Sequence, residues 1–341
     1  MSDAKILVGD CRARLAEIET GSVQTCVTSP PYFGLRDYGN EAQIGLEISP
    51  KEYLKELGGV FNEVWRVLSD DGTLWLNLGD SFAGSGRGPI TENSLQGTNV
   101  GSATGSVRDR GSVNWGARDK ELMGIPWRVA FALQDEGWYL RNDIIWAKPN
   151  PMPESVKDRC TKSHEYLFLF SKSATYYSDM TAISEPAATG WNGSQFDTGK
   201  TADHQLQRMS HQPRFGGTKY GDSDDPAHAT KSGNEYEPNG RRNKRDVWTI
   251  PPQPFPGAHF AVMPEALVEP CVLAGSREGD TVLDPFAGSG TVGVVALRHQ
   301  RNFVGIELNP EYAEMARARI ENDGPLLNTV SYSSHNTQGE P

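Results

Sequence analysis

The stretch TVLDPFAGSGT, residues 281–291, decides the fold because it joins a strand pattern to a helix pattern through a glycine loop. Residues 281–284 are typical of a buried strand, and the apolar spacing of 291–299 predicts a helix. Glycine lets a backbone approach a ligand closely, and a helix N-terminus offers N–H groups that have no partner within the helix. The stretch therefore predicts an α/β unit with a ligand at the turn.

The segment after this helix narrows the kind of ligand. Residues 303–307 form a second strand pattern, which ends in Glu307. A carboxylate in that place can accept hydrogen bonds from both hydroxyls of a ribose, so the ligand is expected to contain a nucleoside. NAD is one such cofactor, but the loop lacks the GxGxxG spacing because no early first glycine precedes Gly288.

Strand and helix patterns alternate through most of the chain. Strands are predicted at 5–10, 23–27, 72–78, 139–146 and 164–170, and helices at 11–19, 50–68, 122–136, 261–276 and 310–321. This alternation indicates an α/β fold with a parallel-type sheet. Polar segments at 83–118 and 187–245 interrupt the pattern, and the last twenty residues are expected to be a tail.

Composition excludes several classes of protein. The net charge of −11 argues against a non-specific nucleic-acid binder, although a basic cleft can exist on an acidic body. The four cysteines are far apart and have no zinc-ligand spacing, so no metal site is expected. There is no apolar run of membrane-spanning length and no evident signal peptide. The expected location is the reducing cytoplasm, away from membranes.

A second motif, TSPPYFG at residues 28–34, follows the strand pattern of 23–27. Proline fixes φ and has no backbone N–H, so Pro30 and Pro31 end the strand in a rigid, extended stub. Ligands bind at the carboxyl ends of the strands in open α/β sheets. A strand-terminating turn alone would explain the two prolines, but it does not explain Ser29 and Tyr32.

Together the two motifs resemble those of the DNA amino-methyltransferases. Ser29-Pro30-Pro31-Tyr32 looks like the catalytic (D/N/S)PP(Y/F) motif of that family, and Phe286-Ala287-Gly288-Ser289-Gly290 looks like its FxGxG loop for S-adenosylmethionine. The catalytic motif comes first and the cofactor loop last, as in the β group. The resemblance covers most of residues 5–320. It implies a circularly permuted, Rossmann-like methyltransferase sheet with polar loop insertions and a small target-recognition region.

The resemblance also assigns the cofactor site and the domain boundaries. Residues implied to bind S-adenosylmethionine are Asp10, Thr28, Asp284, Pro285, Phe286, Ala287, Gly288, Ser289, Gly290, Thr291, Glu307 and Leu308. From sequence alone, Asp10 is equally well explained as a turn aspartate after glycine. Residues 144–150 resemble the wall of the target-base pocket, although Trp146 could simply be core, and 259–276 resemble the cover of the methionine end. The implied parts are a catalytic half at 1–174, a target-recognition insertion at 175–250, a cofactor half at 251–325 and a tail at 326–341.

The catalytic motif suits the methylation of an exocyclic amine. The lone pair of such an amine is conjugated with the base, and two oriented acceptors, the Ser29 hydroxyl and the Pro30 carbonyl, would favour a nitrogen with a freed lone pair. Pro31 removes a competing backbone donor. Tyr32 offers a face on which a flipped base can stack, worth roughly 1–3 kcal/mol, which is comparable with the cost of unstacking the base.

Basic residues are expected around a DNA-binding cleft. The candidates are Arg36, Lys148, Arg241, Arg242, Lys244 and Arg245, together with Arg87, Arg108, Arg110 and Arg118 in the polar segment. Some would contact phosphates, although most could be solvated loop charges.

The sequence therefore predicts a site-specific methyltransferase that moves a methyl group from S-adenosyl-L-methionine to N4 of a flipped cytosine in duplex DNA. Cytosine is favoured because serine leads the motif, and adenine N6 is the alternative. Methylation of RNA or of protein glutamine is disfavoured by the long polar region and the late cofactor loop. A catalytically silent DNA-binding module is disfavoured by intact Ser29, Tyr32, Gly288 and Glu307. A homodimer and a cognate restriction endonuclease are further partners that the resemblance allows.

Overall fold

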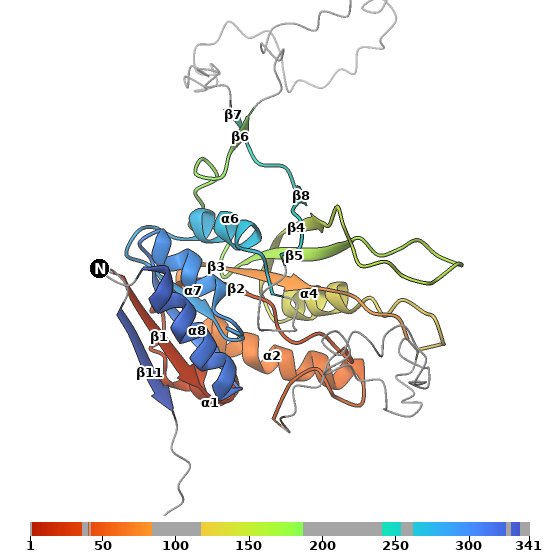
Figure 1. Cartoon of the computed structure of the whole chain (residues 1–341), viewed down its shortest axis with the longest axis horizontal. Coiled ribbons are helices and arrows are strands. Elements are labelled where there is room, and N and C mark those ends of the chain that lie inside the picture. Colours follow the sequence, from red (N-terminus) through yellow and green to blue (C-terminus); the bar gives the residue numbers. More distant parts are fainter. Residues whose placement is uncertain are drawn as a thin grey trace, which may run out of the picture. The chain divides into compact units, whose positions relative to one another are not determined.

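The computed structural model describes residues 2–35, 40, 42–83, 117–186, 241–253, 262–324 and 329–334. Among these residues, nine strands form one sheet in the order β11-β1-β10-β9-β2-β3-β5-β4-β8 (Figure 1). The strands are β1 Asp3–Val8, β2 Val23–Thr28, β3 Leu68–Leu78, β4 Tyr139–Ala147, β5 His164–Ser171, β8 Val247–Thr249, β9 Thr281–Asp284, β10 Asn302–Glu307 and β11 Thr329–Ser334. From β11 to β3 every pairing is parallel, whereas β5 runs antiparallel to both β3 and β4. The expected α/β sheet is confirmed, with an antiparallel strand inserted near one end.

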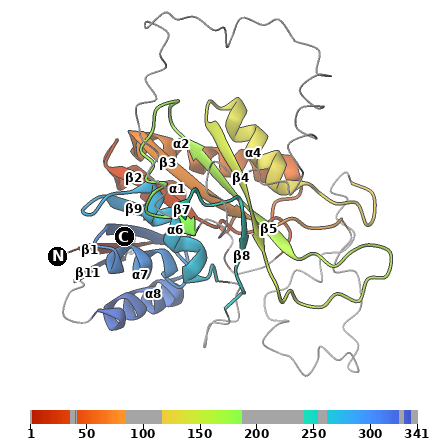
Figure 2. The same ribbon diagram turned by 90° about the horizontal axis from the view of Figure 1, so that it is seen from above.

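Helices cover both faces of this sheet. One layer holds α1 Cys11–Arg14, α2 Pro50–Val67 and α4 Ile125–Asp135, and the other holds α6 Glu265–Gly275, α7 Thr291–Arg298 and α8 Pro310–Asp323. In Figure 2, α2 and α4 lie on the opposite side of the sheet from α7 and α8. Alternate residues along the strands belong to two hydrophobic cores, one on each face of the sheet. Cys26 and Leu74 face the first helix layer, whereas Val27 and Trp75 face the second. None of the described helices is long and apolar enough to cross a membrane.

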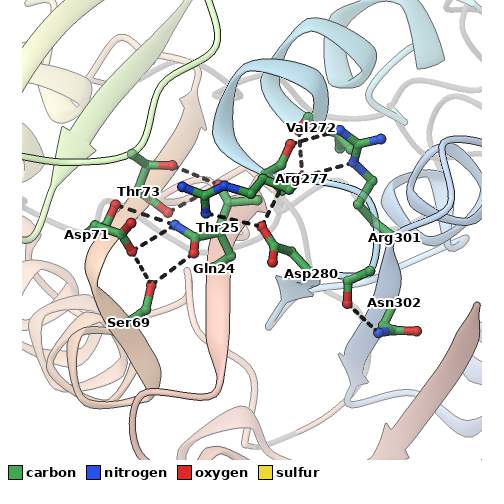
Figure 3. Close-up of polar contacts among 12 residues, drawn as sticks. Gln24, Thr25, Ser69, Asp71, Thr73, Val272, Arg277, Asp280, Arg301 and Asn302 are labelled. Atoms are coloured by element: carbon green, nitrogen blue, oxygen red, sulfur yellow. Dashed lines mark hydrogen bonds and ion pairs between the residues drawn. The ribbon is translucent and has the colours of Figure 1, made fainter.

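Polar contacts hold the amino ends of the central strands (Figure 3). The Gln24 amide donates to Asp71 Oδ1 over 3.1 Å, and the hydroxyls of Thr25 and Thr73 lie 2.9 Å apart. Before β9, the backbone N–H of Arg277 donates to Asp280 over 2.7 Å. These groups satisfy one another at the amino edge of the sheet, and the carboxyl edge carries both sequence motifs.

The prediction of a C-terminal tail is wrong for residues 329–334. These residues form β11, which pairs in parallel with β1 along its whole length. The short strand β8, next to β4, also had no clear sequence signal. The helix predicted at 11–19 is shorter than expected, because α1 gives way to the 3₁₀ turn η1, Leu15–Glu17.

Contacts divide the chain into one unit of Met1–Ile183 with Arg245–Pro341 and a second unit of Ser184–Lys244. In the described part of the second unit, β6 Glu185–Pro186 pairs with β7 Arg241–Arg242. Most of the two polar segments, at 84–116 and 187–240, lies outside the described residues. The expected boundaries at 174, 250 and 325 stay predictions.

Candidate active site

The two motifs meet where the chain direction across the sheet reverses. From β9 the chain passes through α7 to β10 on one side, and from β2 it passes through α2 to β3 on the other. Such a reversal leaves a crevice at the carboxyl ends of the two strands. A cavity of about 430 Å³ lies at this edge, and both motifs line it.

The glycine loop and its flanking residues form one wall of the cavity. The predicted cofactor residues that line it are Asp10, Asp284, Pro285, Phe286, Ala287, Gly288, Ser289, Thr291, Glu307 and Leu308. Two predicted residues, Thr28 and Gly290, are not part of the lining. Gly290 caps α7 with φ of +76°, and a Cβ there would lie 2.9 Å from that of Ala316, so only glycine fits.

Glu307 ties the glycine loop to the start of α8. Its Oε2 accepts the N–H of Gly288 over 2.8 Å, and its Oε1 accepts the N–H of Asn309 over 2.8 Å. Burial raises the pKa of this carboxyl above its usual range. Each carboxylate oxygen has a second lone pair, so both can still accept a hydroxyl from a ligand in the cavity.

Asp284 links the two motifs from a buried position. It is 2% exposed and accepts the Thr28 hydroxyl over 2.6 Å and the N–H of Phe286 over 3.0 Å. Burial raises its pKa to about 7, and the two hydrogen bonds oppose this rise. Thr28 therefore supports the cavity from behind by fixing Asp284.

Asp10 has the contacts of a turn aspartate. Its side chain caps α1 by accepting the N–H of Arg12 over 2.9 Å, and the Arg12 guanidinium pairs with it at 2.6 Å. Arg12 also reaches Glu56 at 2.6 Å and the carbonyl of Ala42 at 2.9 Å. A contact between Asp10 and S-adenosylmethionine, which the resemblance implies, stays a prediction.

The opposite wall contains the serine–proline motif with two polar side chains that sequence reasoning missed, Asn77 and Glu165. Ser29 Oγ lies 3.3 Å from Asn77 Oδ1 and 3.4 Å from the Tyr32 hydroxyl. The Tyr32 hydroxyl lies 3.1 Å from Asn77 Oδ1 and donates to Glu165 Oε2 over 2.7 Å.

Tyr32 is held at both its ring and its hydroxyl. A Cβ on Gly79 would lie 2.5 Å from Tyr32 Cε2, so the ring packs directly against the backbone there. Burial and the charge of Glu165 raise the pKa of Tyr32 well above its ordinary value, which keeps the hydroxyl protonated. The Pro31 carbonyl accepts the Tyr53 hydroxyl over 2.8 Å, which fixes the stub from outside.

Lys148, predicted as a DNA-binding residue, lines the cavity. Its ammonium pairs with Glu165, and the two side chains are 18% and 15% exposed. The same ammonium lies 4.2 Å from the centroid of the Trp146 ring. Trp146 is both core and cavity wall, since it is 4% exposed and still belongs to the lining.

Of the other predicted DNA-binding residues, Arg118 and Arg245 are described in the first unit, and neither is part of the cavity lining. Arg36 lies outside the described residues, as do Arg87, Arg108 and Arg110. Arg118 pairs with Glu121 at 3.0 Å. In the second unit, Arg241 donates to the Ser184 hydroxyl over 2.7 Å and Arg242 pairs with Glu185 at 2.9 Å. The roles of all these arginines, and of Lys244 and Arg245, stay predictions.

The segment predicted to cover the methionine end is described from residue 262 onward. Val262 and Met263 line the cavity, and α6 follows them. Residues 259–261 lie outside the described part of the chain. Within that described part, no cluster of three or more histidine, cysteine, aspartate or glutamate side chains could hold a metal ion.

Comparison with known proteins gives one family and several full-length relatives. A family model described as DNA methylase matches residues 23–318. The type II methyltransferase M.Cfr9I of Citrobacter freundii is 43% identical over 95% of this chain and 89% of its own. The type II methyltransferase M.SmaI of Serratia marcescens is 45% identical over 94% of this chain and 91% of its own.

Solved structures share the fold. A Thermus thermophilus protein described as a putative DNA modification methylase, solved with S-adenosyl-L-methionine, has a TM-score of 0.55 at 23% identity, covering 97% of this chain and 100% of its own. The PvuII DNA methyltransferase, described as cytosine-N4-specific, has a TM-score of 0.58 at 19% identity, covering 94% of this chain and 86% of its own. At these identities the likeness shows the Rossmann-like arrangement alone.

Proposed function

The chain belongs to the N6/N4 family of DNA methylases, as a type II DNA methyltransferase that uses S-adenosyl-L-methionine, and from this premise we propose that it methylates N4 of a flipped cytosine in duplex DNA. Membership of the family leaves two amines open, cytosine N4 and adenine N6. The choice between them rests on the serine that leads the catalytic motif and on the groups that face it.

The glycine-loop wall fits the cofactor. Glu307 places carboxylate oxygens in the cavity beside Gly288, where a ribose can be held through both hydroxyls. The volume of about 430 Å³ lies within the range of small-molecule sites. S-adenosyl-L-methionine supplies a methyl group on a positively charged sulfur when bound. Residues 284–289 and Thr291, with Glu307 and Leu308, would hold its nucleoside, and Val262 and Met263 would lie against the rest.

One observation carries the proposal that the target is an exocyclic amine: the Ser29 hydroxyl faces acceptors inside the protein. Asn77 Oδ1 and the Tyr32 oxygen are the polar atoms described within reach of Ser29 Oγ. A hydroxyl has one proton and two lone pairs. If that proton goes inward, the lone pairs of Ser29 are left for an N–H of the target amine.

The residues of the motif would then prepare the amine for methyl transfer. Ser29 Oγ and the Pro30 carbonyl accept its two N–H groups, which favours a tetrahedral nitrogen with a freed lone pair. Acceptors held rigid before the reaction stabilise developing charge without reorganising. The prolines provide this rigidity, and the contact between Tyr53 and Pro31 adds to it.

Lys148 favours cytosine over adenine at this place. Its ammonium donates to Glu165 and has further N–H groups in the same cavity. Beside its amine, cytosine presents two acceptors, N3 and O2, whereas adenine presents N1 followed by a C–H. The Lys148 ammonium could donate a hydrogen bond to N3 of cytosine. Ser29 would then not be needed as the donor to N3. Duplex DNA conceals these groups, so the base would be flipped into the cavity.

The proposal is tested with tritiated S-adenosyl-L-methionine and DNA, RNA or protein as acceptor, followed by chromatography of the digested product. We expect label in DNA alone, as N4-methylcytosine. Label in N6-methyladenine would favour the second candidate, which the single acceptor N1 of adenine permits. Label in RNA or protein would contradict the DNA substrate. A cognate restriction endonuclease and a homodimer stay predictions, tested by sequencing the neighbouring genes and by light scattering.

A further inference from the structure

The hydroxyls of Ser29 and Tyr32 lead inward to a carboxylate, which gives the hydrogen bonds a direction. Asn77 Nδ2 donates to the carbonyl of Tyr166 over 3.1 Å, so its Oδ1 is the atom that faces both hydroxyls. An amide oxygen and an ionised carboxylate only accept hydrogen bonds. Neither Asn77 Oδ1 nor Glu165 can therefore donate to the two hydroxyls.

The single proton of Tyr32 goes to Glu165. That contact is 2.7 Å long and its acceptor is charged, whereas the contact with Asn77 is 3.1 Å long and its acceptor is neutral. Charged acceptors make the stronger hydrogen bonds. The Tyr32 oxygen is thus left with lone pairs that face Ser29 at 3.4 Å.

Lys148 and Tyr32 each engage one oxygen of Glu165. The ammonium pairs with Glu165 Oε1, and Tyr32 occupies Oε2. The ion pair thus leaves Oε2 as the oxygen that receives the Tyr32 proton.

We propose that Glu165 is a positioning residue that acts through Tyr32 to fix Ser29 as a hydrogen-bond acceptor for the target amine. The direction runs from the amine N–H to Ser29, from Ser29 to Tyr32 or Asn77, and from Tyr32 to Glu165. Hydrogen bonds arranged in one direction polarise each other. The proposal rests on the proposed function, since it needs an amine in the cavity, and it holds for cytosine and adenine alike.

A purely structural role for Glu165 predicts something different. The ion pair joins Lys148, the residue after β4, to Glu165 of β5, and these two strands are already paired. On that account, Glu165→Gln lowers stability and Tyr32→Phe leaves the reaction intact, because phenylalanine keeps the ring packed on Gly79.

The test is a double-mutant cycle on the single-turnover rate of methyl transfer. We expect Tyr32→Phe and Glu165→Gln each to slow transfer on the order of 10- to 100-fold, by analogy with residues that orient a ligating group. The double variant should be no slower than the slower single variant, because both changes break one chain. Affinities for DNA and cofactor, measured separately, should stay within about twofold of wild type if binding is not involved.

Tyr53→Phe is the matched control, because it removes the hydroxyl that donates to the Pro31 carbonyl, a contact outside the series of hydrogen bonds from Ser29 to Glu165. In the double variant, the fold-reduction in rate caused by Tyr53→Phe should multiply with that caused by Glu165→Gln. Wild-type rate in Tyr32→Phe, or multiplication of the Tyr32 and Glu165 effects, would overturn the proposal. The proposed function is tested separately, by identifying the base that the wild-type enzyme methylates in digested product DNA. The role of Glu165 is tested only by rates relative to wild type.

Discussion

The hydroxyl of Thr28 donates a hydrogen bond of 2.6 Å to Asp284, a residue 256 positions further along the chain. Thr28 is the last residue of β2 and precedes the serine–proline motif, whereas Asp284 ends β9 and begins the glycine loop. Together with the parallel pairing of β2 and β9, this contact therefore sets the spacing between the serine–proline motif and the glycine loop. Methyl transfer depends on that spacing, because holding two reactants near contact lowers the barrier.

Thr28→Val should weaken this junction with little change in shape. The variant leaves Asp284 buried without its hydroxyl donor, and an unsatisfied buried group costs roughly 1–3 kcal/mol. Denaturant unfolding should show a loss of this size. Thr20→Val, at a hydroxyl that accepts from Arg66 on the exposed surface, is the control and should change stability little. Equal losses in the two variants would contradict a special role for the buried junction.

Stability should fall as pH rises toward neutrality, because the folded-state pKa of Asp284 is raised from 3.8 to about 7. Between these values the folded state keeps the proton and the unfolded state releases it, so this contribution to stability is complete below 3.8 and is lost by the time pH passes about 7. Asp284→Asn cannot titrate. Relative to this variant, wild type should lose unfolding free energy from about pH 4 to about pH 7 in denaturant titrations, and parallel curves would argue against the shift.

Glu307→Ala should weaken binding of S-adenosyl-L-methionine by roughly 1–3 kcal/mol, the usual cost of losing a charged hydrogen-bond partner. Calorimetry measures this directly. Because Glu307 also holds Gly288 and Asn309, Glu307→Gln, which keeps an acceptor, serves as the comparison and should bind more tightly than the alanine variant. Affinity unchanged in Glu307→Ala would contradict its placement at the ribose.

Gly290→Ala should destabilise the protein more than Gly21→Ala. Both glycines have similar positive φ, +76° and +73°, so the backbone strain of about 1–2 kcal/mol is common to the two variants. A Cβ at 290 would meet Ala316 at 2.9 Å, whereas nothing lies within 4 Å of a Cβ at 21. The difference between their unfolding free energies isolates the close approach of α8 to the glycine loop; equal values would show that this packing relaxes freely.

The fold and the two motifs could be predicted because their signals are local. Glycines and prolines punctuate strand ends, and apolar periodicity marks helices, so the elements within 281–307 and the strand and stub within 23–32 follow from the residues themselves. The strand at 329–334 was not predicted, because serines alternate with Val330 and Tyr332 in a short edge strand with little apolar content.

Glu165 and Asn77 were not predicted as site residues, for a different reason. A parallel-type sheet would put Glu165, near the start of its strand, at the edge away from the site. Because β5 is antiparallel, its beginning lies beside the end of β3, and Tyr166 pairs with Leu78. Asn77 interrupts the apolar run Leu74–Leu78 of β3, which is a usable signal for a functional polar residue, but its partners lie 45, 48 and 89 residues away.

The most direct test of the central claim is mass spectrometry of nucleosides from DNA treated with the enzyme and methyl-deuterated S-adenosyl-L-methionine, with Ser29→Ala run in parallel. The account predicts deuterated N4-methylcytosine from wild type, and a rate lowered roughly 10²-fold or more in Ser29→Ala with cofactor affinity preserved, as when one oriented hydrogen-bond partner is lost. Deuterated N6-methyladenine without N4-methylcytosine, or a Ser29→Ala variant as fast as wild type, would contradict it.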